Sequence, residues 1–484
     1  MTEPNLNNEN TGRSDEINVK ADFWEPEIIS NTPLSETSNL TNSLKENSNS
    51  SSDLKNMSAD DISQLVSDES ELDELLSSGS SHEGSNSADT SSITDIETNQ
   101  AHNHIEMRQI AGLGAGTVMQ LTEGVFSFKE GDKESAFSVS VKDGVPTILP
   151  GNSDVWVDDQ LVTQPTLLSN HILNVGSARF SIQTPRPEYG QYSKPIEPDS
   201  RTTITVPKFE SISKSEWVPG SGDATQSPQN LNTESWEFIE EIRAARDEDA
   251  RIQRLLHPDP EELAHRIDSG GFSLLNRDSD HPFFARFSIA YGSIPWIPKF
   301  NDNSAIPTNL HSNIDQLCIL NSVPITCNLT NGPLAIVGPR TARLAVTRHS
   351  ILSLVALNTP KKIELKIITT DKNYDSSWEW LSNLPSWVSS TENDYRVIIA
   401  DSYRSLVLAG LEDTLSENND IGLIIVADSL AEVPPYCSIV LQVSDQGSCR
   451  ATSKNGDSLS GTAIGVTEQF SYQTAGKISE ITNK

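Results

Sequence analysis

Four residues have types and positions that suit contact with a nucleotide phosphate. Gly338, Arg340 and Thr341 lie in a tight turn after the apolar run Leu334–Val337, and Asp428 lies at the end of another apolar run, within Gly422–Leu430. A phosphate-binding loop needs glycines for close backbone approach, a lysine for the phosphates and a Ser or Thr for magnesium. The turn offers the glycine and the threonine but an arginine and a proline in place of the lysine, so it predicts a nucleotide-binding scaffold without its ligands.

The elements that must position these residues lie in the stretch Gly332–Asp371. The first apolar run is followed by the turn, by an amphipathic segment and by a second apolar run, Ile363–Ile368. This order predicts a strand, a helix and a parallel strand, which is one βαβ unit. The apolar positions of its helix are Ala342, Ala345, Val346, Leu352 and Val355.

Two interpretations of Arg340 and Asp428 stay open. Arg340 could meet a phosphate at the start of the helix, or it could be a solvent-facing or interface arginine. Asp428 could hold magnesium, but Ser429 follows it where a glutamate would orient the attacking water. The missing lysine favours a structural role for both residues. We therefore expect no catalytic residue, and the four residues are only candidates for nucleotide contact.

Other reactive residues form no recognisable site. The four cysteines, Cys318, Cys327, Cys437 and Cys449, have no CxxC spacing, and the nine histidines form no ligand pattern with cysteines or carboxylates. No nucleophile motif of the Gly-x-Ser-x-Gly kind is present. The expectation is unpaired thiols in a reducing compartment, with no metal and no cofactor.

The charge of the chain is strongly acidic and unevenly distributed. The formal net charge is −33 over 484 residues, and residues 1–104 carry 21 Asp and Glu against 4 Lys and Arg, which is half of the excess. Direct nucleic-acid binding is not expected from such a charge. The sequence also has no secretory signal and no apolar run of membrane-spanning length, which predicts a cytoplasmic protein that reaches the membrane only through a partner.

Residues 1–104 are rich in Ser, Asn, Asp and Glu and predict a disordered acidic tail. Within it, Ser58–Ser77 places six aliphatic residues near one helical face. This segment either folds onto a partner or is a transient helix without consequence. Residues 185–232, with Pro and Gly turns, predict a linker.

Residues 105–184 contain short β-branched and aromatic runs separated by Gly, Asp, Asn or Pro, which predict an all-β sandwich. The segments GVFSFKEGD, DVWVDDQLV and HILNVGSARFSI resemble, in this order, the strands of forkhead-associated (FHA) domains. The resemblance implies phosphothreonine binding, with Lys129 nearest to the phosphate-binding arginine. Asp158-Asp159 replaces the Asn-Gly pair of the family and would repel a phosphate. We therefore favour a degenerate FHA-like sandwich that does not bind phosphopeptides.

Residues 233–267 predict two helices, Thr233–His257 with Thr233 as its cap and Asp259–Ile267. The apolar side of the first is formed by Trp236, Ile239, Ile242, Ile252 and Leu255.

From His257 to Trp296 the sequence HPDPEELAHRIDSGGFSLLNRDSDHPFFARFSIAYGSIPW resembles the stretch ahead of the ATPase modules in actinobacterial FtsK/SpoIIIE-type proteins, the group that includes the EccC/EssC motors of type VII secretion. GPLAIVGPRTARLAV, WEWLSNLPSW and GLIIVADSL continue the likeness. It implies that residues 268–484 form a P-loop-like α/β lobe that lacks Walker A.

These observations predict a multidomain, non-catalytic accessory or scaffold protein of translocases that acts by protein–protein binding. An FtsK/SpoIIIE-type ATPase, as in cell division or secretion, is the partner that the resemblance implies. Two alternatives stay open. The chain could be part of an ATP-driven DNA or protein translocase whose motor modules lie on another chain, or it could be a phosphothreonine-binding FHA protein.

Overall fold

The computed structural model describes residues 26–27, 105–128, 137–158, 160–168, 171–183, 201–207, 214–215, 217–220, 232–270, 274–301, 306–369, 376–390, 395–411 and 421–482. All the elements described below belong to one compact unit. The prediction of a disordered tail falls outside these residues, except that Pro26–Glu27 (β1) pairs with a strand of the N-terminal domain.

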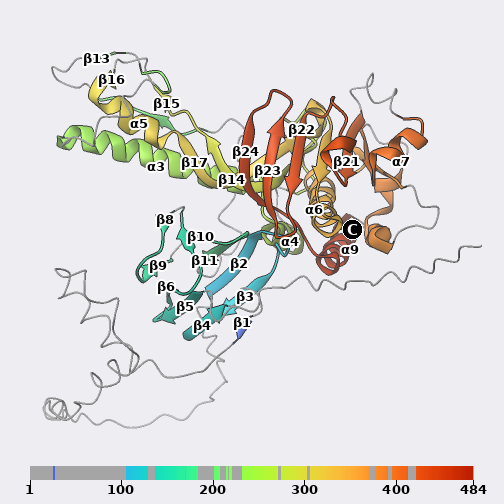
Figure 1. The fold of residues 1–484 in the computed structure, drawn as a ribbon, viewed down its shortest axis with the longest axis horizontal. Helices are drawn as coiled ribbons and strands as arrows, with labels where there is room; N and C mark the ends of the chain where they lie inside the picture. The colour runs from blue at the N-terminus through green and yellow to red at the C-terminus, as the bar shows by residue number, and fades with distance from the viewer. Residues whose placement is uncertain are drawn as a thin grey trace, which may run out of the picture. The chain divides into compact units, whose positions relative to one another are not determined.

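The N-terminal domain is a sandwich of two sheets (Figure 1). One sheet has the order β1-β4-β5-β6-β9, and its strands after β1 are Gly124–Phe128 (β4), Phe137–Lys142 (β5), Val145–Pro150 (β6) and Thr166–Leu167 (β9). The other has the order β3-β2-β11-β10-β7-β8, with strands Ile105–Ala111 (β2), Val118–Leu121 (β3), Val155–Val157 (β7), Gln160–Leu161 (β8), Ile172–Val175 (β10) and Ala178–Gln183 (β11). Apolar side chains of both sheets alternate inward and form one core, in which the rings of Phe128 and Phe137 stack 4.6 Å apart.

The C-terminal lobe contains a nine-stranded mixed sheet in the order β17-β14-β24-β23-β22-β18-β21-β20-β19. Its parallel half consists of Leu334–Val337 (β18), Ile363–Ile368 (β19), Tyr395–Ala400 (β20), Ile421–Ala427 (β21) and Ile439–Val443 (β22). Its antiparallel half adds Arg286–Pro295 (β14), Ile319–Asn328 (β17), Ser448–Ser453 (β23) and Ser458–Ala463 (β24).

The parallel strands are buried on both faces, which explains their continuous apolar runs. In β18, Leu334 and Ile336 belong to one core and Ala335 and Val337 to the other. Helices Arg340–Leu357 (α6) and Glu468–Thr482 (α9) contribute to the first core, and Tyr403–Leu408 (α7) contributes to the second. The segments Ser376–Asn383 (η6), Ser386–Ser389 (η7) and Leu430–Glu432 (η8) are 3-10 turns.

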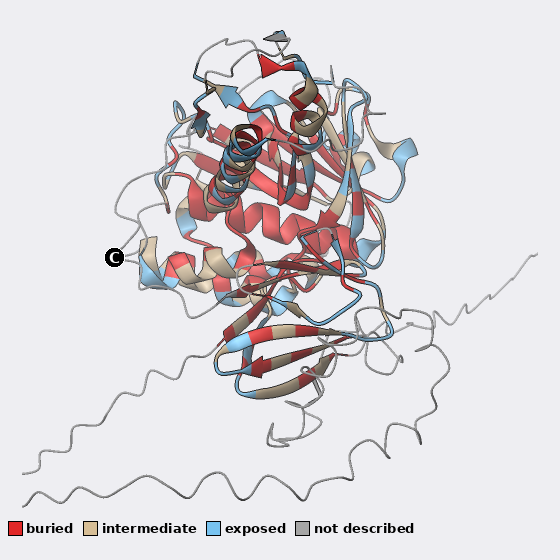
Figure 2. Cartoon of the chain, turned by 90° about the vertical axis from the view of Figure 1, so that its left-hand side faces the viewer, coloured by how far each residue is buried: buried red, intermediate tan, exposed pale blue. Residues whose placement is uncertain are grey.

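Helix α6 lies inside the lobe and is buried all round. Each residue from Ala342 to Leu357 is buried, as the continuous red helix in Figure 2 shows. The helix contacts α9, β14, β18, β21 and Pro260–Ser269 (α4). The prediction of an amphipathic helix was therefore wrong, because the helix is enclosed on every side and not only against the sheet.

The predicted βαβ unit is confirmed in its elements, but its two strands are not neighbours. β18 and β19 are parallel members of one sheet and are separated by β21 and β20. As a result, the strand that ends at Asp428 lies directly beside the strand that ends at Gly338.

Two short strands from the predicted linker pair with segments near α3. They are Thr203–Ile204 (β12), which pairs with Lys299–Phe300 (β15), and Lys214–Ser215 (β13), which pairs with Ile306–Pro307 (β16). A separate small core joins β12 and β16 to helices Thr233–Leu256 (α3) and His311–Leu317 (α5) and to the 3-10 turn Thr308–Leu310 (η4).

Two details of α3 differ from the sequence prediction. Asn232, not Thr233, caps the helix by accepting a hydrogen bond from the Ser235 backbone N–H at 2.8 Å. Trp236 was expected on the apolar side but is 53% exposed. Phe238, which the prediction omitted, is buried in the small core instead of Trp236. α4 begins after Asp259, whose carboxylate caps its first turn.

The sandwich and the lobe share backbone hydrogen bonds. The Gly112 N–H donates to the carbonyl of Ala463 at 2.8 Å, and the Gly112 carbonyl accepts the Gly465 backbone N–H at 3.0 Å. Around them lies a small buried cluster with members from both parts: Ile110, Ala111, Ala115, Ile172, Tyr291 and Ile464. Arg179 adds bonds to the hydroxyls of Ser322 and Thr462.

Candidate functional site: the carboxyl ends of the parallel strands

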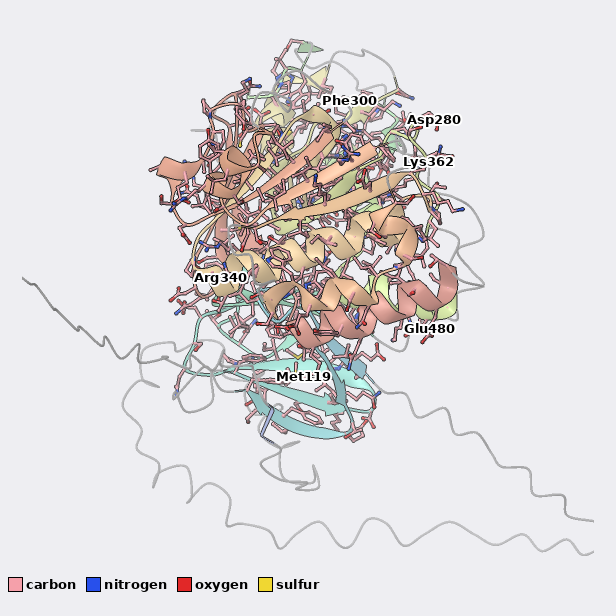
Figure 3. The ribbon with its side chains drawn as sticks, turned by 90° about the vertical axis from the view of Figure 1, so that its right-hand side faces the viewer. Met119, Asp280, Phe300, Arg340, Lys362 and Glu480 are labelled. Atoms are coloured by element: carbon pink, nitrogen blue, oxygen red, sulfur yellow. The ribbon has the colours of Figure 1, made fainter. Side chains whose placement is uncertain are left out.

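The carboxyl ends of the parallel strands bring together the candidate residues of the lobe. In open α/β sheets ligands bind at this edge, because the turns that leave the strands lie there side by side. Gly338 follows β18 and Asp428 follows β21, while Asp401 follows β20. Figure 3 marks Arg340 on this lobe, away from Met119 in the sandwich.

Gly338 has a packing role that only glycine can fill. Its φ is +152°, and a Cβ added to it would lie 2.2 Å from the carbonyl oxygen of Val443, at the end of the neighbouring strand β22. The turn is also short, because β18 ends at Val337 and α6 begins at Arg340. Two residues cannot wrap around a phosphate as a Walker A loop does.

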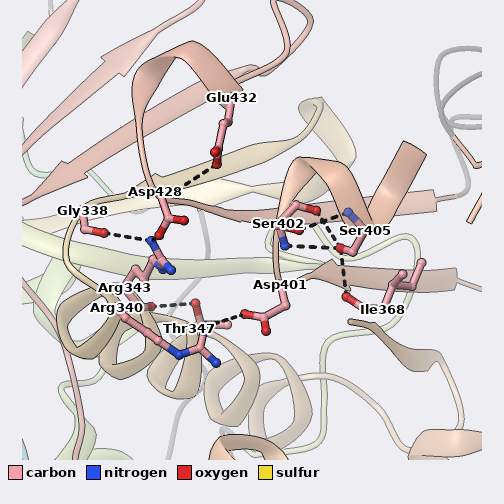
Figure 4. A network of polar contacts seen from close by, with 10 residues as sticks. All are labelled: Gly338, Arg340, Arg343, Thr347, Ile368, Asp401, Ser402, Ser405, Asp428 and Glu432. Carbon is pink, nitrogen blue, oxygen red and sulfur yellow. Dashed lines mark hydrogen bonds and ion pairs between the residues drawn. The ribbon is translucent and has the colours of Figure 1, made fainter. Parts of the chain in front are cut away.

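Arg343 fills the space between the two strand ends. It is 4% exposed, and its Nη1 donates to the carbonyl of Gly338 at 3.1 Å and to the carboxylate of Asp428 (Figure 4). The Asp428 backbone N–H in turn donates to the Glu432 carboxylate at 3.1 Å. The Asp428 carboxylate, a candidate for holding magnesium, is thus bound to a cation of the protein itself.

Arg340 points along a different direction. Its guanidinium lies 3.4 Å from the carboxylate of Asp401, with 41% of the Arg340 side chain exposed. Thr341 is exposed. Beside them, Ser402 and Ser405 form a capping box for α7, and the Ser405 hydroxyl donates to the carbonyl of Ile368 at 3.1 Å. The groups at these strand ends therefore pair with one another.

The structure brings the candidates Gly338 and Asp428 together at neighbouring strand ends, and Arg343, which the sequence analysis did not single out, joins them. Arg343 stands three residues after Arg340 on the same helix. Residues three apart share a helix face, so this spacing was the signal that a second arginine could reach the same strand ends.

The sandwich candidate cannot be placed, because Lys129 and Asp159 lie outside the described residues. Asp158 is described and is engaged within the domain. Its carboxylate lies 2.5 Å from the His171 ring and accepts the Ile172 backbone N–H at 3.0 Å. Asp158 also has a φ of +47°, so it acts in the turn between β7 and β8. Phosphothreonine binding by the sandwich stays an alternative that the sequence leaves open.

The described thiols and histidines are poor candidates for chemistry. All four cysteines are free, and burial raises the pKa of Cys327, Cys437 and Cys449 to about 12. These thiols are not thiolate nucleophiles at neutral pH. Within the described residues, no group of three or more His, Cys, Asp and Glu is arranged to hold a metal ion. No described helix has the length and apolarity needed to cross a membrane.

No family model matches the chain, and no curated protein matches it. Among solved structures, the cytoplasmic domain of the type VII secretion ATPase EccC from Thermomonospora curvata is similar at 12% identity and a TM-score of 0.30, over 43% of this chain and 32% of that one. EssC (ATPases 2 and 3) from Geobacillus thermodenitrificans is similar at 11% identity and a TM-score of 0.29, over 43% and 51%. The FHA domain structure of Rv0020c is similar at 16% identity and a TM-score of 0.16, over 18% and 98%. The chain thus has weak structural likeness to EccC/EssC ATPase domains and to FHA domains.

Proposed function

We propose that this protein acts by binding other proteins and does not bind or hydrolyse nucleotide at the carboxyl ends of its parallel strands. The observation that carries the proposal is the pairing of Arg343 with Gly338 and Asp428. In a nucleotide site, phosphate oxygens would occupy the space that the Arg343 guanidinium fills here. Magnesium would bind the carboxylate that Arg343 pairs with here.

The charge balance at this edge supports the proposal. Arg343 pairs with Asp428, and Arg340 pairs with Asp401. A triphosphate would have to break at least one of these ion pairs and would leave a carboxylate facing it. The two-residue turn after β18 offers it few backbone N–H groups in exchange.

The finer part of the proposal concerns the partner. The order of motifs from HPDP to GLIIVADSL supports docking of the lobe on an ATPase module of the FtsK/SpoIIIE type that another chain supplies. A cytoplasmic location, and a place at the membrane only through that partner, belong to the same proposal. In the alternative, the two chains together form one ATP-driven translocase.

The test is nucleotide binding by the purified full chain. A fluorescent ATP analogue with magnesium should give no saturable signal, and phosphate release should stay at the rate of the buffer. A P-loop ATPase with an intact lysine serves as the positive control. Tight binding with magnesium-dependent turnover, lost in Asp428→Asn but kept in the control Asp154→Asn, which changes an exposed carboxylate of the sandwich, would overturn the proposal.

The alternative is tested by mixing this chain with a chain that carries a GxxxxGK[ST] module. Under the accessory proposal, the added chain hydrolyses ATP with its own residues, and Arg343→Met in this chain changes only the affinity between the two or nothing. If Asp428→Asn abolishes turnover in the mixture without weakening assembly, the lobe contributes directly to a composite motor.

A further inference from the structure

A hollow of about 210 Å³ lies at the amino end of β18, at the opposite end of this strand from the candidate site. We call it the Arg286 hollow; it is lined by Arg286, Thr326, Asn328, Asn331, Ser438 and Ile439. One side of the hollow is formed by β14 and β17, where Arg286 pairs with Asn328. The other side is formed by Asn331, before β18, and by Ser438 and Ile439 at the start of β22. At 3.3 Å per residue, the four-residue strand β18 keeps the hollow roughly 13 Å from Gly338.

Arg286 gives the hollow an unbalanced positive charge. Its guanidinium lies over the ring of Phe283 at 5.0 Å, and its Nε is enclosed without a hydrogen-bond partner. No ion pair joins it to a carboxylate among the residues that the structure describes. Burial lowers the pKa of Arg286. The opposing electrostatic effect, which raises this pKa, comes from the Cys327 thiol and not from a described carboxylate. A half-buried arginine whose charge no described carboxylate balances is stabilised by an anion.

The other polar groups of the hollow can add donors. The Asn328 side-chain oxygen accepts hydrogen bonds from the backbone N–H and the hydroxyl of Thr330, at 3.0 and 2.9 Å. The oxygen is thereby assigned, so the NH₂ group of Asn328 is available as a donor. Asn331 is exposed at the rim and carries a second carboxamide. Ser438 is held in place because its hydroxyl donates to the Pro333 carbonyl at 2.9 Å.

The size of the hollow limits its ligand. Pockets for drug-sized molecules measure about 300–1,000 Å³, so a hollow of about 210 Å³ suits one small group and not a nucleotide. A guanidinium with neighbouring carboxamides, and no carboxylate in the lining, matches the oxygens of a single anion. We propose that the Arg286 hollow binds one small oxyanion, a phosphate or a carboxylate group.

The experiment measures thermal unfolding of the purified full chain during titration with inorganic phosphate or acetate, against chloride at equal ionic strength. Binding to the folded state raises the unfolding temperature in a saturable way. Asn331→Asp places a negative charge at the exposed rim and should remove the rise. Gln164→Glu adds the same charge on an exposed position of the sandwich and should keep it.

A second pair of variants tests the arginine itself. Arg286→Met should abolish the anion-dependent rise, whereas Arg404→Met, which removes an exposed arginine from α7, should leave it unchanged. Because Arg286→Met also removes the contact of the guanidinium with the Phe283 ring and so changes the starting stability, the decisive quantity is the rise caused by the anion. A rise with phosphate alone or with acetate alone identifies the anion class. Equal rises in the wild type and in Asn331→Asp, or no rise with either anion, would overturn the proposal.

Discussion

An arginine lies near each end of strand β18, but only one of the two is paired with a described carboxylate. At the carboxyl end, Arg343 is paired with the Gly338 carbonyl and the Asp428 carboxylate. At the amino end, Arg286 lies against Phe283 beside an open hollow, and no ion pair with a described carboxylate balances it. The end that carries the sequence signature of a nucleotide site has its charges satisfied, while the end without any signature has a charge still to be balanced.

The contrast teaches that a scaffold and a site are separate properties of a fold. A strand–turn–helix places groups where phosphates bind in other proteins, but the pairing of those groups decides whether a ligand is needed. Four predictions test this contrast, from the largest expected effect to the smallest.

Gly338→Ala should be the most destabilising change at the carboxyl end. A Cβ would lie 2.2 Å from the Val443 carbonyl oxygen at a φ of +152°. Backbone strain and overpacking together should lower the free energy of unfolding by about 3 kcal/mol or more. Urea unfolding gives this value. Gly144→Ala is the matched control, because its φ is +71° but no atom lies within 4 Å of the added Cβ. Equal losses in both variants would show that the turn is not tightly packed against β22.

Arg343→Met should lower the free energy of unfolding by about 1–3 kcal/mol, since it leaves the Gly338 carbonyl and Asp428 without their cation. Asp428→Asn should cost less, because its side chain is 69% exposed and the amide keeps an oxygen for Arg343. Chemical unfolding of both variants checks the order. If Arg343→Met is as stable as the wild type, the arginine does not hold the strand ends together and the proposed contrast fails.

His349→Gln should make the free energy of unfolding depend less on pH in the acid range. His349 lies in the middle of the buried helix α6, and burial lowers its pKa from 6.5 to about 3. The unfolded chain binds a proton that the folded chain does not, so stability falls as the pH drops from about 6.5 towards 3. The slope from this residue is about 1.4 kcal/mol per pH unit.

The measurement is the difference in slope between wild type and His349→Gln over this pH range. The pKa of buried His257 is also lowered, but His257 is present in both proteins and its contribution cancels. An unchanged slope would mean that His349 is protonated in the folded state, which its hydrogen bond with Ser288 at 3.1 Å does not require.

Arg340→Ala should have the smallest effect, at most about 1 kcal/mol, because its pair with Asp401 is 3.4 Å long and partly exposed. The loss should shrink further in high salt. Unfolding at two salt concentrations tests this. A loss as large as that of Arg343→Met would show that the exposed arginine is the one that organises the strand ends.

Much of the secondary structure could be predicted because burial imposes visible patterns. The runs at β18, β19 and β21 are continuous because these strands are covered on both faces. β2 was missed because Glu106, Arg108 and Gln109 interrupt its apolar alternation. Arg108 is nevertheless 2% exposed, since it lies near the carboxylates of Glu261 and Glu262 on α4. Arg108 is thus buried by carboxylates from a distant part of the chain, which the alternation of apolar residues along β2 does not reveal.

The candidate residues show the same limit. Gly338 and Asp428 could be located from strand ends, because parallel strands place their carboxyl ends at one edge. The Arg286 hollow could not be found, since Arg286, Asn331 and Ser438 are far apart in the sequence and only the order of strands in the sheet brings them together. Pairing of charges is likewise a property of the folded chain, and a motif does not contain it.

The hydrogen bonds of Gly112 with Ala463 and Gly465 have a mechanical consequence. They join the sandwich to the end of β24 and to the segment that leads to α9, so the two parts are held together by more than the continuity of the chain. A pull on the sandwich would therefore load the sheet of the lobe at β24. A sandwich expressed alone would expose Ile110 and Ile172 to water. The sandwich and the lobe are thus joined by backbone hydrogen bonds and a shared buried cluster, although the sequence describes them as separate domains.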